Sequence, residues 1–413
     1  MSGPPRPAGL VRRILVVGGG PAGTFAAIAA KQQDPHASVV LLTREHCEPY
    51  EKPPLSKAVL IGTAEPEAAP IAGPQGVGGH GVVLELRADC AAIDRATRVV
   101  VLDDGRRLPY DALVICTGAG VRELPLLPVG MPRVHYLRTE ADAHALTAAL
   151  RRARDLLVVG GGLIGLEVAA SAATLGLRIV VVEAAPRILS RVCDEEVGAV
   201  VAAAHRQHRV DIRVSTMLAS ATTEPDGRVA VATSTGDRLV ADLVVVGTGS
   251  APDTGVAARA GLAVDDGIVV DAHCRTDDPA IFAAGDCGRF PGPHGLVRLE
   301  NWIHAQDHGT VAGRNAAGAN DTYSAVPSFW SEQYDLYLQG VGWPTAVGTR
   351  VRRPLGDNRL LAFEITDGRL THAIGINVQR DIAMARRLIE RRVPVEASAL
   401  ADPGQALSAL LKR

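Results

Sequence analysis

The chain has no pair of cysteines at C-x-x-C spacing, and no cysteine pairs with histidine at the spacing of a metal site. It has six cysteines in 413 residues, and most of them lie in apolar or strand-like surroundings, which predicts buried thiols. They are Cys47, Cys90, Cys116, Cys193, Cys274 and Cys287. Neither a redox-active dithiol nor a bound metal ion is therefore expected.

An excess of charge of one sign and long apolar runs are also lacking. The chain has 43 Lys and Arg residues against 45 Asp and Glu, a net charge of −2, which argues against nucleic-acid binding. No run of about 18 apolar residues appears, so we expect no membrane span. The segment Met1–Arg13 is rich in proline and glycine and has no apolar signal core. Together these features predict a soluble cytoplasmic protein.

Two glycine-rich loops are the most informative features that are present. Each has G-x-G-x-x-G spacing, follows a short apolar run and opens an alanine-rich stretch. The first glycine permits a tight turn, the second lets a pyrophosphate approach the backbone at a helix N-terminus, and the third lets helix and strand pack closely. One such motif is a weak indication, because ordinary glycine turns match it, but two predict two dinucleotide sites. The residues expected to contact the nucleotides are Gly18, Gly20, Pro21, Ala22 and Gly23 in the first loop and Gly160, Gly162, Leu163, Ile164 and Gly165 in the second.

An acidic side chain is expected after the second strand of each nucleotide-binding unit, where it accepts hydrogen bonds from a ribose. After the first loop the apolar run 39–42 leads to Glu45, and after the second loop the run 179–182 leads directly to Glu183. A carboxylate at Glu183 repels a 2′-phosphate, which favours NADH over NADPH. Arg187 follows closely and could in principle pair with such a phosphate.

The chain contains a diverged internal duplication. Residues 107–118 resemble residues 238–249, and the two glycine loops align at a different offset, so loop lengths changed between the copies. Both copies run in the order strand, loop, helix, strand, acid, antiparallel excursion, strand, Thr-Gly. This order predicts an α/β fold with two Rossmann-like domains built on parallel sheets.

The region from Val326 onward has a different pattern. It has strand-like stretches at 360–363 and 373–376, a charged helix candidate at 382–392 and an apolar tail at 407–411. This pattern predicts a small α+β domain. The predicted division is a discontinuous domain of residues 1–118 and 250–325, a second domain of residues 119–249 and a third of residues 326–413. Residues 62–82, rich in Gly, Pro and Ala, are expected to form a loose surface connection.

Several segments resemble the FAD-containing ferredoxin reductases, the family of putidaredoxin reductase and of the reductases that serve ring-hydroxylating dioxygenases. They are residues 50–57, 160–167, 253–254, 276–286, 298–306 and 329–333. The resemblance covers nearly the whole chain and implies a glutathione-reductase-like architecture. In that family the first glycine loop holds FAD, the second holds NADH, and the third domain covers the flavin.

The resemblance also implies two catalytic residues. Lys57 is expected near the flavin N5, where positive charge favours hydride uptake, and Glu167 is expected across from it, where it orients the nicotinamide amide. Local sequence leaves other interpretations open. Lys57 is also compatible with a solvated surface lysine, and Glu167 with an acid favoured by the helix macrodipole.

Further cofactor contacts follow from the same resemblance. Glu45 is expected on the FAD ribose and Asp286 on the ribityl chain, and Trp302 and Trp330 either flank the flavin or pack in the core. The remaining residues expected to bind cofactor are Lys52, Pro53, Thr117, Gly118, Arg122, Gly249 and Gly285. We expect His304 and His308 to be helix-surface or internally satisfied histidines.

The chain departs from the family in places. Gly120 stands where the family has an arginine, so Arg122 is the candidate replacement, and Lys52 replaces an arginine, keeping the charge but losing its forked geometry. A basic pair that some members carry corresponds here to Thr310 and Val311, which leaves the docking surface open.

The predicted function is transfer of electrons from NADH through FAD to a [2Fe-2S] ferredoxin that serves a cytochrome P450 or a ring-hydroxylating dioxygenase. We expect a monomer or weak homodimer. Two alternatives stay open. The first is an NADH oxidase-type flavoprotein, although the turn at residues 53–57 has no thiol. The second is a redox-switched binding flavoprotein resembling apoptosis-inducing factor.

Overall fold

The computed structural model describes residues 11–65, 70–324, 326–345, 347–356 and 359–412. The chain divides into two compact units. Unit 1 comprises Met1–Glu51, Glu67–Gly120 and Pro252–Ala325, and unit 2 comprises Lys52–Pro66, Val121–Ala251 and Val326–Arg413. The segment Lys52–Pro66 thus falls outside the unit that contains the first glycine loop, and the three-domain division remains a prediction. Most of Met1–Arg13 and part of the expected connection at 62–82 lie outside the described residues.

Unit 1 is built on a five-stranded parallel sheet in the order β19-β7-β1-β2-β3. Its strands are β1 (Arg13–Val17), β2 (Ser38–Leu42), β3 (Val83–Glu85), β7 (Ala112–Ile115) and β19 (Ile281–Ala283). Strand β7 is apolar and buried along its whole length, and β1 is apolar and buried after its first residue, as expected for strands covered on both faces. The antiparallel excursion is β4 (Cys90–Asp94), β5 (Val99–Leu102) and β6 (Arg107–Pro109). The other elements are β18 (Ile268–Val269), β20 (Gly288–Gly292), β21 (Gly295–Val297), α6 (Gly255–Arg259) and short 3₁₀ turns at Val77–His80 and Gly285–Cys287.

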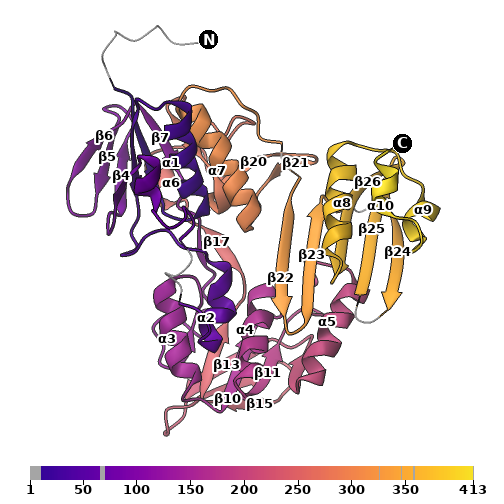
Figure 1. Ribbon diagram of the computed structural model, residues 1–413. Helices are drawn as coiled ribbons and strands as arrows, with labels where there is room; N and C mark the ends of the chain where they lie inside the picture. Colours follow the sequence, from indigo (N-terminus) through magenta and orange to yellow (C-terminus); the bar gives the residue numbers. More distant parts are fainter. Residues whose placement is uncertain (1–10, 66–69, 325, 346, 357–358, 413) are drawn as a thin grey trace. The chain divides into compact units, whose positions relative to one another are not determined.

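Two helices of unit 1, α1 (Pro21–Gln33) and α7 (Trp302–Ala316), lie side by side (Figure 1). A Cβ on Gly309 would overlap the carbonyl oxygen of Ala22, and one on Gly313 would overlap that of Ala26. The two backbones are therefore in direct contact, and only glycine fits at both positions. This contact fixes the start of α1, which follows the first glycine loop.

The nucleotide-type sheet of unit 2 repeats the plan of unit 1. Its parallel order is β12-β11-β10-β16-β9. The strands are β9 (Val134–His135), β10 (Asp155–Val159), β11 (Arg178–Val182), β12 (Val210–Arg213) and β16 (Leu243–Val246), with helices α3 (Glu140–Leu150), α4 (Leu163–Thr174) and α5 (Glu195–Gln207). An antiparallel excursion follows, formed by β13 (Leu218–Thr223), β14 (Val229–Thr233) and β15 (Arg238–Ala241). The predicted duplication is confirmed. Two further short strands, β8 (Ala119–Val121) and β17 (Ser250–Pro252), pair with each other.

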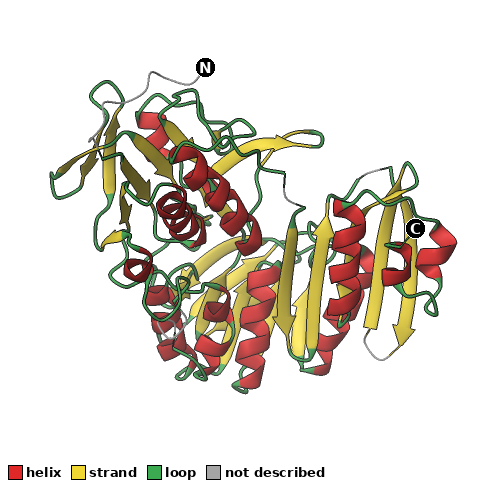
Figure 2. Ribbon diagram, turned by 45° about the horizontal axis from the view of Figure 1, so that its top comes forward, coloured by secondary structure: helices red, strands yellow, loops and turns green. Residues whose placement is uncertain are grey.

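The region after Val326 forms an antiparallel sheet in the order β22-β23-β26-β25-β24, with helices on one face (Figure 2). Its elements are β22 (Ser328–Gln333), β23 (Leu336–Gly342), β24 (Thr349–Gly356), β25 (Arg359–Thr366), β26 (Arg369–Ile376), α8 (Gln379–Glu390), α9 (Ala397–Ala401) and α10 (Leu407–Leu410). The predicted strands are confirmed, and the apolar tail contains the short helix α10. The charged helix begins three residues earlier than predicted and ends two residues earlier, because its amphipathic pattern does not mark its caps.

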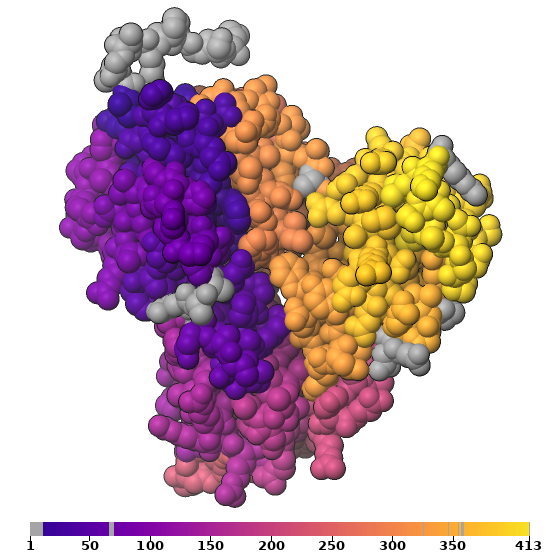
Figure 3. Space-filling model, in the orientation of Figure 1, coloured from indigo at the N-terminus to yellow at the C-terminus, as the bar shows by residue number. Residues whose placement is uncertain are grey.

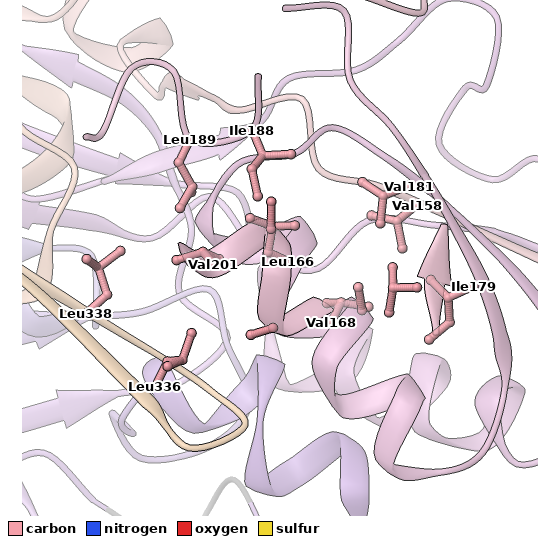
Figure 4. Close-up of a cluster of buried hydrophobic side chains, with 14 of the residues drawn as sticks. Val158, Leu166, Val168, Ile179, Val181, Ile188, Leu189, Val201, Leu336 and Leu338 are labelled. Carbon is pink, nitrogen blue, oxygen red and sulfur yellow. The ribbon is translucent and has the colours of Figure 1, made fainter. Parts of the chain in front are cut away.

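One apolar core runs through unit 2 and joins this antiparallel sheet to the parallel one. Leu336 and Leu338 of β23 belong to the same cluster as Leu166 of α4 and Val201 of α5 (Figure 4). The short helix α2 (Ala58–Ile61) packs against α3 and α4, and its Leu60 is buried in the same cluster. In the space-filling view the indigo surface of this segment of unit 2 adjoins a magenta surface (Figure 3). Three segments far apart in the sequence are therefore held together by one core.

Among the described residues, no helix combines the length and the apolar character needed to cross a bilayer.

Candidate functional site

The first glycine loop connects β1 to α1. Gly18 has φ +110°, and a Cβ there would overlap the carbonyl oxygen of Cys116, so this position requires glycine. A Cβ on Gly23 would overlap the Gly18 carbonyl. Gly20 differs, because a Cβ there would meet nothing within 4 Å. The N-cap of α1 is therefore open and has no side-chain cap. A pyrophosphate can be placed on the backbone N–H groups of Ala22 and Gly23, because Pro21, the first helical residue, has no N–H to donate.

The second loop, between β10 and α4, has the same design. Gly160 has φ +111° and its Cβ would overlap the carbonyl oxygen of Gly247, while that of Gly165 would overlap the Gly160 carbonyl. Gly162 is open and is the uncapped N-cap of α4. Leu163 and Ile164 begin the helix, and Ile164 is exposed.

The two acids that follow the second strands occupy different places. Glu183 comes directly after β11, and its carboxylate accepts hydrogen bonds from the N–H of Gly161 at 2.6 Å and of Ala185 at 2.7 Å. The position directly after β2 is Thr43, whose side chain lies 2.7 Å from a Cβ placed on Gly19. Glu45 lies two residues further on and accepts a hydrogen bond from the Tyr50 hydroxyl at 2.6 Å. Sequence analysis missed Thr43, which the matching registers of β1–β2 and β10–β11 identify.

Other predicted residues of unit 1 gather around β7 and the 3₁₀ turn after β19. Thr117 donates a hydrogen bond to the carbonyl oxygen of Asp253 at 2.5 Å, and Gly118 accepts one from the N–H of Asp253 at 2.9 Å. Gly285 has φ +77° and lies in the 3₁₀ turn that carries Asp286.

Trp302 begins α7 and makes an edge-on contact with Phe25, with ring centroids 5.9 Å apart. It also lies near Glu51, whose pKa is raised by burial, an effect that Trp302 partly opposes. Its surroundings in unit 1 are therefore partly polar rather than a purely apolar core.

His304 and His308 are buried in α7, which excludes the helix-surface alternative and leaves the internally hydrogen-bonded one. His304 Nδ1 lies 2.7 Å from the Tyr323 hydroxyl, and His308 Nδ1 accepts a hydrogen bond from the N–H of Gly285 at 3.2 Å. Burial lowers the pKa of His304 to about 4 and that of His308 well below its ordinary value. Both rings are neutral near pH 7, and His308 supports the turn that carries Asp286.

In unit 2 the structure brings Lys57 and Glu167 together, as expected. Lys57 Nζ lies 2.9 Å from Glu167 Oε2, and the exposed fractions of the two side chains are 19% and 3%. The solvated-surface interpretation of Lys57 is therefore wrong. Lys57 also donates to the carbonyl oxygen of Pro53 at 3.0 Å.

Two hydroxyl groups that sequence analysis did not assign complete the shell of Glu167. Ser56 donates to Oε2, and Ser331 donates to Oε1 at 2.6 Å. With Lys57, these make three donors on one buried carboxylate, which compensates for its loss of water. The helix macrodipole alone therefore does not explain Glu167. Both serines lie in segments that carried the family resemblance, at 50–57 and 329–333, and that was the available indication.

Of the remaining predicted residues of unit 2, Arg122 and Lys52 lie next to the ends of elements and Trp330 lies within a strand. Arg122 donates its backbone N–H to the carbonyl oxygen of Gly249 at 3.0 Å and its guanidinium to that of Ser250 at 3.3 Å. Lys52 precedes the 3₁₀ turn that Pro53 opens, and Trp330 lies half-buried in β22.

Arg187 is held by the loop that follows β11. Its guanidinium donates to three backbone carbonyls of the following loop, those of Leu189 at 3.5 Å, Ser190 at 3.1 Å and Asp194 at 3.4 Å. The side chain therefore holds the shape of the loop after β11.

Five of the six cysteines are buried, and no disulfide joins any of the six, all of which lie in the described part of the chain. Burial raises the pKa of each of the five, to about 11 for Cys193 and about 12 for Cys90. The prediction of buried thiols is confirmed, and these five are not thiolates near pH 7.

Two parallel sheets, each followed by a glycine-rich helix start, and a buried Lys–Glu ion pair together define a dinucleotide-binding oxidoreductase. Residues 12–309 match the pyridine nucleotide-disulphide oxidoreductase family, and residues 328–411 match the reductase C-terminal family. The chain belongs to the pyridine nucleotide-disulphide oxidoreductase family.

Ferredoxin reductases are among the proteins to which it is similar. It is 40% identical to the ferredoxin–NAD(+) reductase component of the anthranilate 1,2-dioxygenase system of Burkholderia cepacia, over 96% of this chain and 98% of that protein. It is 37% identical to rhodocoxin reductase of Rhodococcus erythropolis, over 94% and 92%. Among solved structures, putidaredoxin reductase in its covalent complex with putidaredoxin matches with a TM-score of 0.92 and 33% identity, over 97% of this chain and 98% of that one.

The family implies FAD and a pyridine nucleotide, and the structure fits both. Gly20 and Gly162 are open N-caps, one in each unit, while the flanking glycines leave no room for a side chain. Each unit thus presents one helix start on which a pyrophosphate can be placed.

Proposed function

We propose that the protein passes electrons from NADH through FAD to a [2Fe-2S] ferredoxin that serves a cytochrome P450 or a ring-hydroxylating dioxygenase. The observation that carries the proposal is the buried Lys57–Glu167 pair in a family member that lacks a C-x-x-C dithiol. Bound FAD would accept a hydride from NADH and release electrons one at a time. Without a dithiol to receive them inside the chain, those electrons leave to a separate protein.

The side chains contribute charge and position rather than proton transfer. Lys57 places an ammonium group beside a buried carboxylate, and the two hydroxyls on Glu167 fix where that carboxylate points. A fixed positive charge near an accepting ring stabilises the negative charge that develops during hydride uptake. Glu167 is suited to orient a nicotinamide amide, since a held carboxylate accepts its N–H groups in one geometry.

We propose that the first loop, with Glu45, Asp286 and the residues around Thr117, holds FAD, and that the second loop, with Glu183, holds NADH. NADH rather than NADPH is favoured because Glu183 ends β11 with a carboxylate, and because Arg187 is engaged by three backbone carbonyls. We expect NADH to exceed NADPH by at least tenfold in kcat/KM, a difference of about 1.4 kcal/mol. Equal rates with both nucleotides would contradict this assignment.

An anaerobic titration of the purified protein with NADH tests the function directly. We expect a yellow protein whose flavin absorbance bleaches with one equivalent of NADH. Cytochrome c reduction with a panel of [2Fe-2S] ferredoxins then identifies the acceptor. A colourless protein refutes the FAD assignment. Full-speed oxidation by air with no gain from any ferredoxin indicates an oxidase. Slow turnover with every ferredoxin, a long-lived reduced complex and a redox-linked change of oligomeric state indicate a redox-switched binding protein.

A further inference from the structure

The hydrogen bonds around Glu167 continue into unit 2 beyond Ser331. Gln333 Nε2 lies 3.1 Å from Ser331 Oγ, and Gln333 Oε1 lies 2.8 Å from His205 Nε2. His205 Nδ1 lies 3.1 Å from the Tyr334 hydroxyl. Three elements supply this chain: helix α4 gives Glu167, strand β22 with its turn gives the next side chains, and helix α5 gives His205.

The direction of each hydrogen bond in this series follows from the first one, between Ser331 and Glu167. An ionised carboxylate only accepts, so Ser331 uses its single proton on Glu167 and must accept from Gln333 Nε2. The amide then presents Oε1 to His205, which places the ring proton on Nε2. If the Gln333 amide were flipped, its Oε1 would face the Ser331 oxygen, whose only proton is already donated to Glu167.

The far end of the chain follows from the same logic. With its proton on Nε2, His205 has a bare Nδ1, so the Tyr334 hydroxyl must donate to it. Burial lowers the pKa of His205 to about 4, so the ring is neutral near pH 7. The hydrogen bonds therefore all run in one direction: from Tyr334 each group donates to the next, and the last donates to Glu167.

The turn at Tyr334 provides a second observation. Tyr334 has φ +57°, in a two-residue turn between β22 and β23 where glycine is the usual residue. A bulky side chain in this region is strained, and such strain persists only where the surroundings hold it. Here the ring stacks on His208, with centroids 3.7 Å apart and planes within 6°, while its hydroxyl reaches His205.

We propose that Gln333 and His205 are positioning residues for Glu167 and, through it, for Lys57. The inference rests on the proposed function, in which that pair acts in hydride transfer from NADH. Ser331 and Gln333 lie two residues apart on β22 and so face the same side of the sheet. The antiparallel region thus supplies part of the support for a carboxylate on the nucleotide-binding helix. Aligned donors reinforce one another in a buried site, so loss of the middle link loosens the carboxylate at the end.

Histidine-selective ¹⁵N NMR of the oxidised, FAD-loaded protein tests the chain without turnover. We expect His205, assigned from the signal lost in His205→Asn, to be the neutral Nε2–H tautomer with a hydrogen-bonded Nδ1. Tyr334→Phe removes one hydroxyl and keeps the stack on His208, so the Nδ1 shift should move toward that of a free ring nitrogen. A neutral Nδ1–H tautomer, an imidazolium at pH 7, or no shift in the Phe variant would overturn the chain.

Stopped-flow reduction by NADH tests the positioning role. We expect Gln333→Leu to lower the limiting rate of flavin reduction about tenfold, with FAD content and the Kd for NADH unchanged, because orientation and not binding is lost. Glu332→Gln is the matched control, since Glu332 is the exposed neighbour on the same strand, and we expect its rate within about twofold of the parent.

The outcomes separate this inference from the proposed function. A parent protein that NADH does not reduce overturns the proposed function, while the NMR result still decides the hydrogen-bond chain. A parent that is reduced normally, with Gln333→Leu equal to Glu332→Gln, overturns the positioning role alone. If Gln333→Leu does not fold, Tyr334→Phe replaces it, and we expect a smaller loss of limiting rate with an unchanged Kd; a parent-like rate then overturns the positioning role.

Discussion

The two nucleotide-type sheets share their strand order, their glycine loops and their antiparallel excursions, but they diverge at two places. The fifth strand is β19, late in the chain, in unit 1, and it is β9, which precedes the loop, in unit 2. After the second strand, Thr43 stands in one copy and Glu183 in the other. The duplicated parts build the two open helix starts, and under the proposed assignment the residue after the second strand distinguishes the nucleotide that each one takes.

The connections after the second strands differ most. In the first copy this connection contains the segment that carries Ser56 and Lys57, and in the second it contains α5, which carries His205. Both segments belong to unit 2, and Glu167 lies at the end of bonds from each. The connections that follow the second strands of the two copies thus both contribute side chains to the surroundings of Glu167, although the two connections differ in structure.

The largest expected effect separates the two loops. Gly18→Ala forces a side chain into φ +110° and into the Cys116 carbonyl, so we expect a protein that loses FAD and at least about 3 kcal/mol of stability. Gly160→Ala should keep its FAD and lose reduction by NADH. The ratio of flavin to protein absorbance and an NADH titration measure both. Loss of flavin from the Gly160 variant with retention in the Gly18 variant would reverse the assignment of the loops.

The second prediction contrasts a buried ion pair with an exposed one. Lys57→Met leaves the Glu167 carboxylate buried without its cation, and we expect a loss of about 3 kcal/mol in the free energy of unfolding by urea. The pair Arg44–Asp253 of unit 1 has side chains 54% and 35% exposed, so Arg44→Met should cost less than about 1 kcal/mol. The double variant Lys57→Met/Glu167→Leu should recover most of the loss. Additive losses in the double variant would show that the two groups do not interact.

The third prediction concerns pH and applies to both units. The pKa of His205 in unit 2 and of His304 in unit 1 is lowered by burial from 6.5 to about 4. Below pH 6.5 the unfolded chain binds more protons at these rings, so stability is complete above pH 6.5 and is lost as pH falls toward 4. Each ring accounts for on the order of 3 kcal/mol across that window.

Urea unfolding at pH 7.5, 6 and 5 measures this slope before most carboxylates titrate. His205→Asn should remove the share of His205 and leave that of His304. A pH-independent midpoint across this range in the parent protein would contradict the buried neutral state of both rings.

The smallest expected effect tests the acid that distinguishes the copies. Glu183→Ala removes the acceptor at the end of β11, and we expect the KM for NADH to rise about tenfold, or about 1.4 kcal/mol, with FAD content unchanged. The preference over NADPH should shrink accordingly. Thr43→Ala is the counterpart in unit 1 and should leave NADH kinetics unchanged. An unchanged KM in the Glu183 variant would remove the basis for the nucleotide preference.

The glycine loops, the apolar strands and the duplication could be predicted from sequence because each rests on a short local pattern. The approach of Lys57 to Glu167 followed from the family resemblance. Thr43 was missed because only strand register shows that it, and not Glu45, directly follows its strand. Whether His304 and His308 lie on the surface or in the interior was left open, because a helix with alanine and glycine on its buried face does not reveal which side is covered. The bonds from Glu167 to His205 join three distant segments, which no local pattern records.

The contact between α1 and α7 has a mechanical consequence. Gly309 and Gly313 bring the two helix backbones together with no side chain between them. Such a helix pair encloses little void volume, so its compressibility under hydrostatic pressure is low. The first glycine loop therefore leads into a rigid pair of helices. A displacement of the start of α1 is transmitted through the backbone contact to α7, which begins at Trp302.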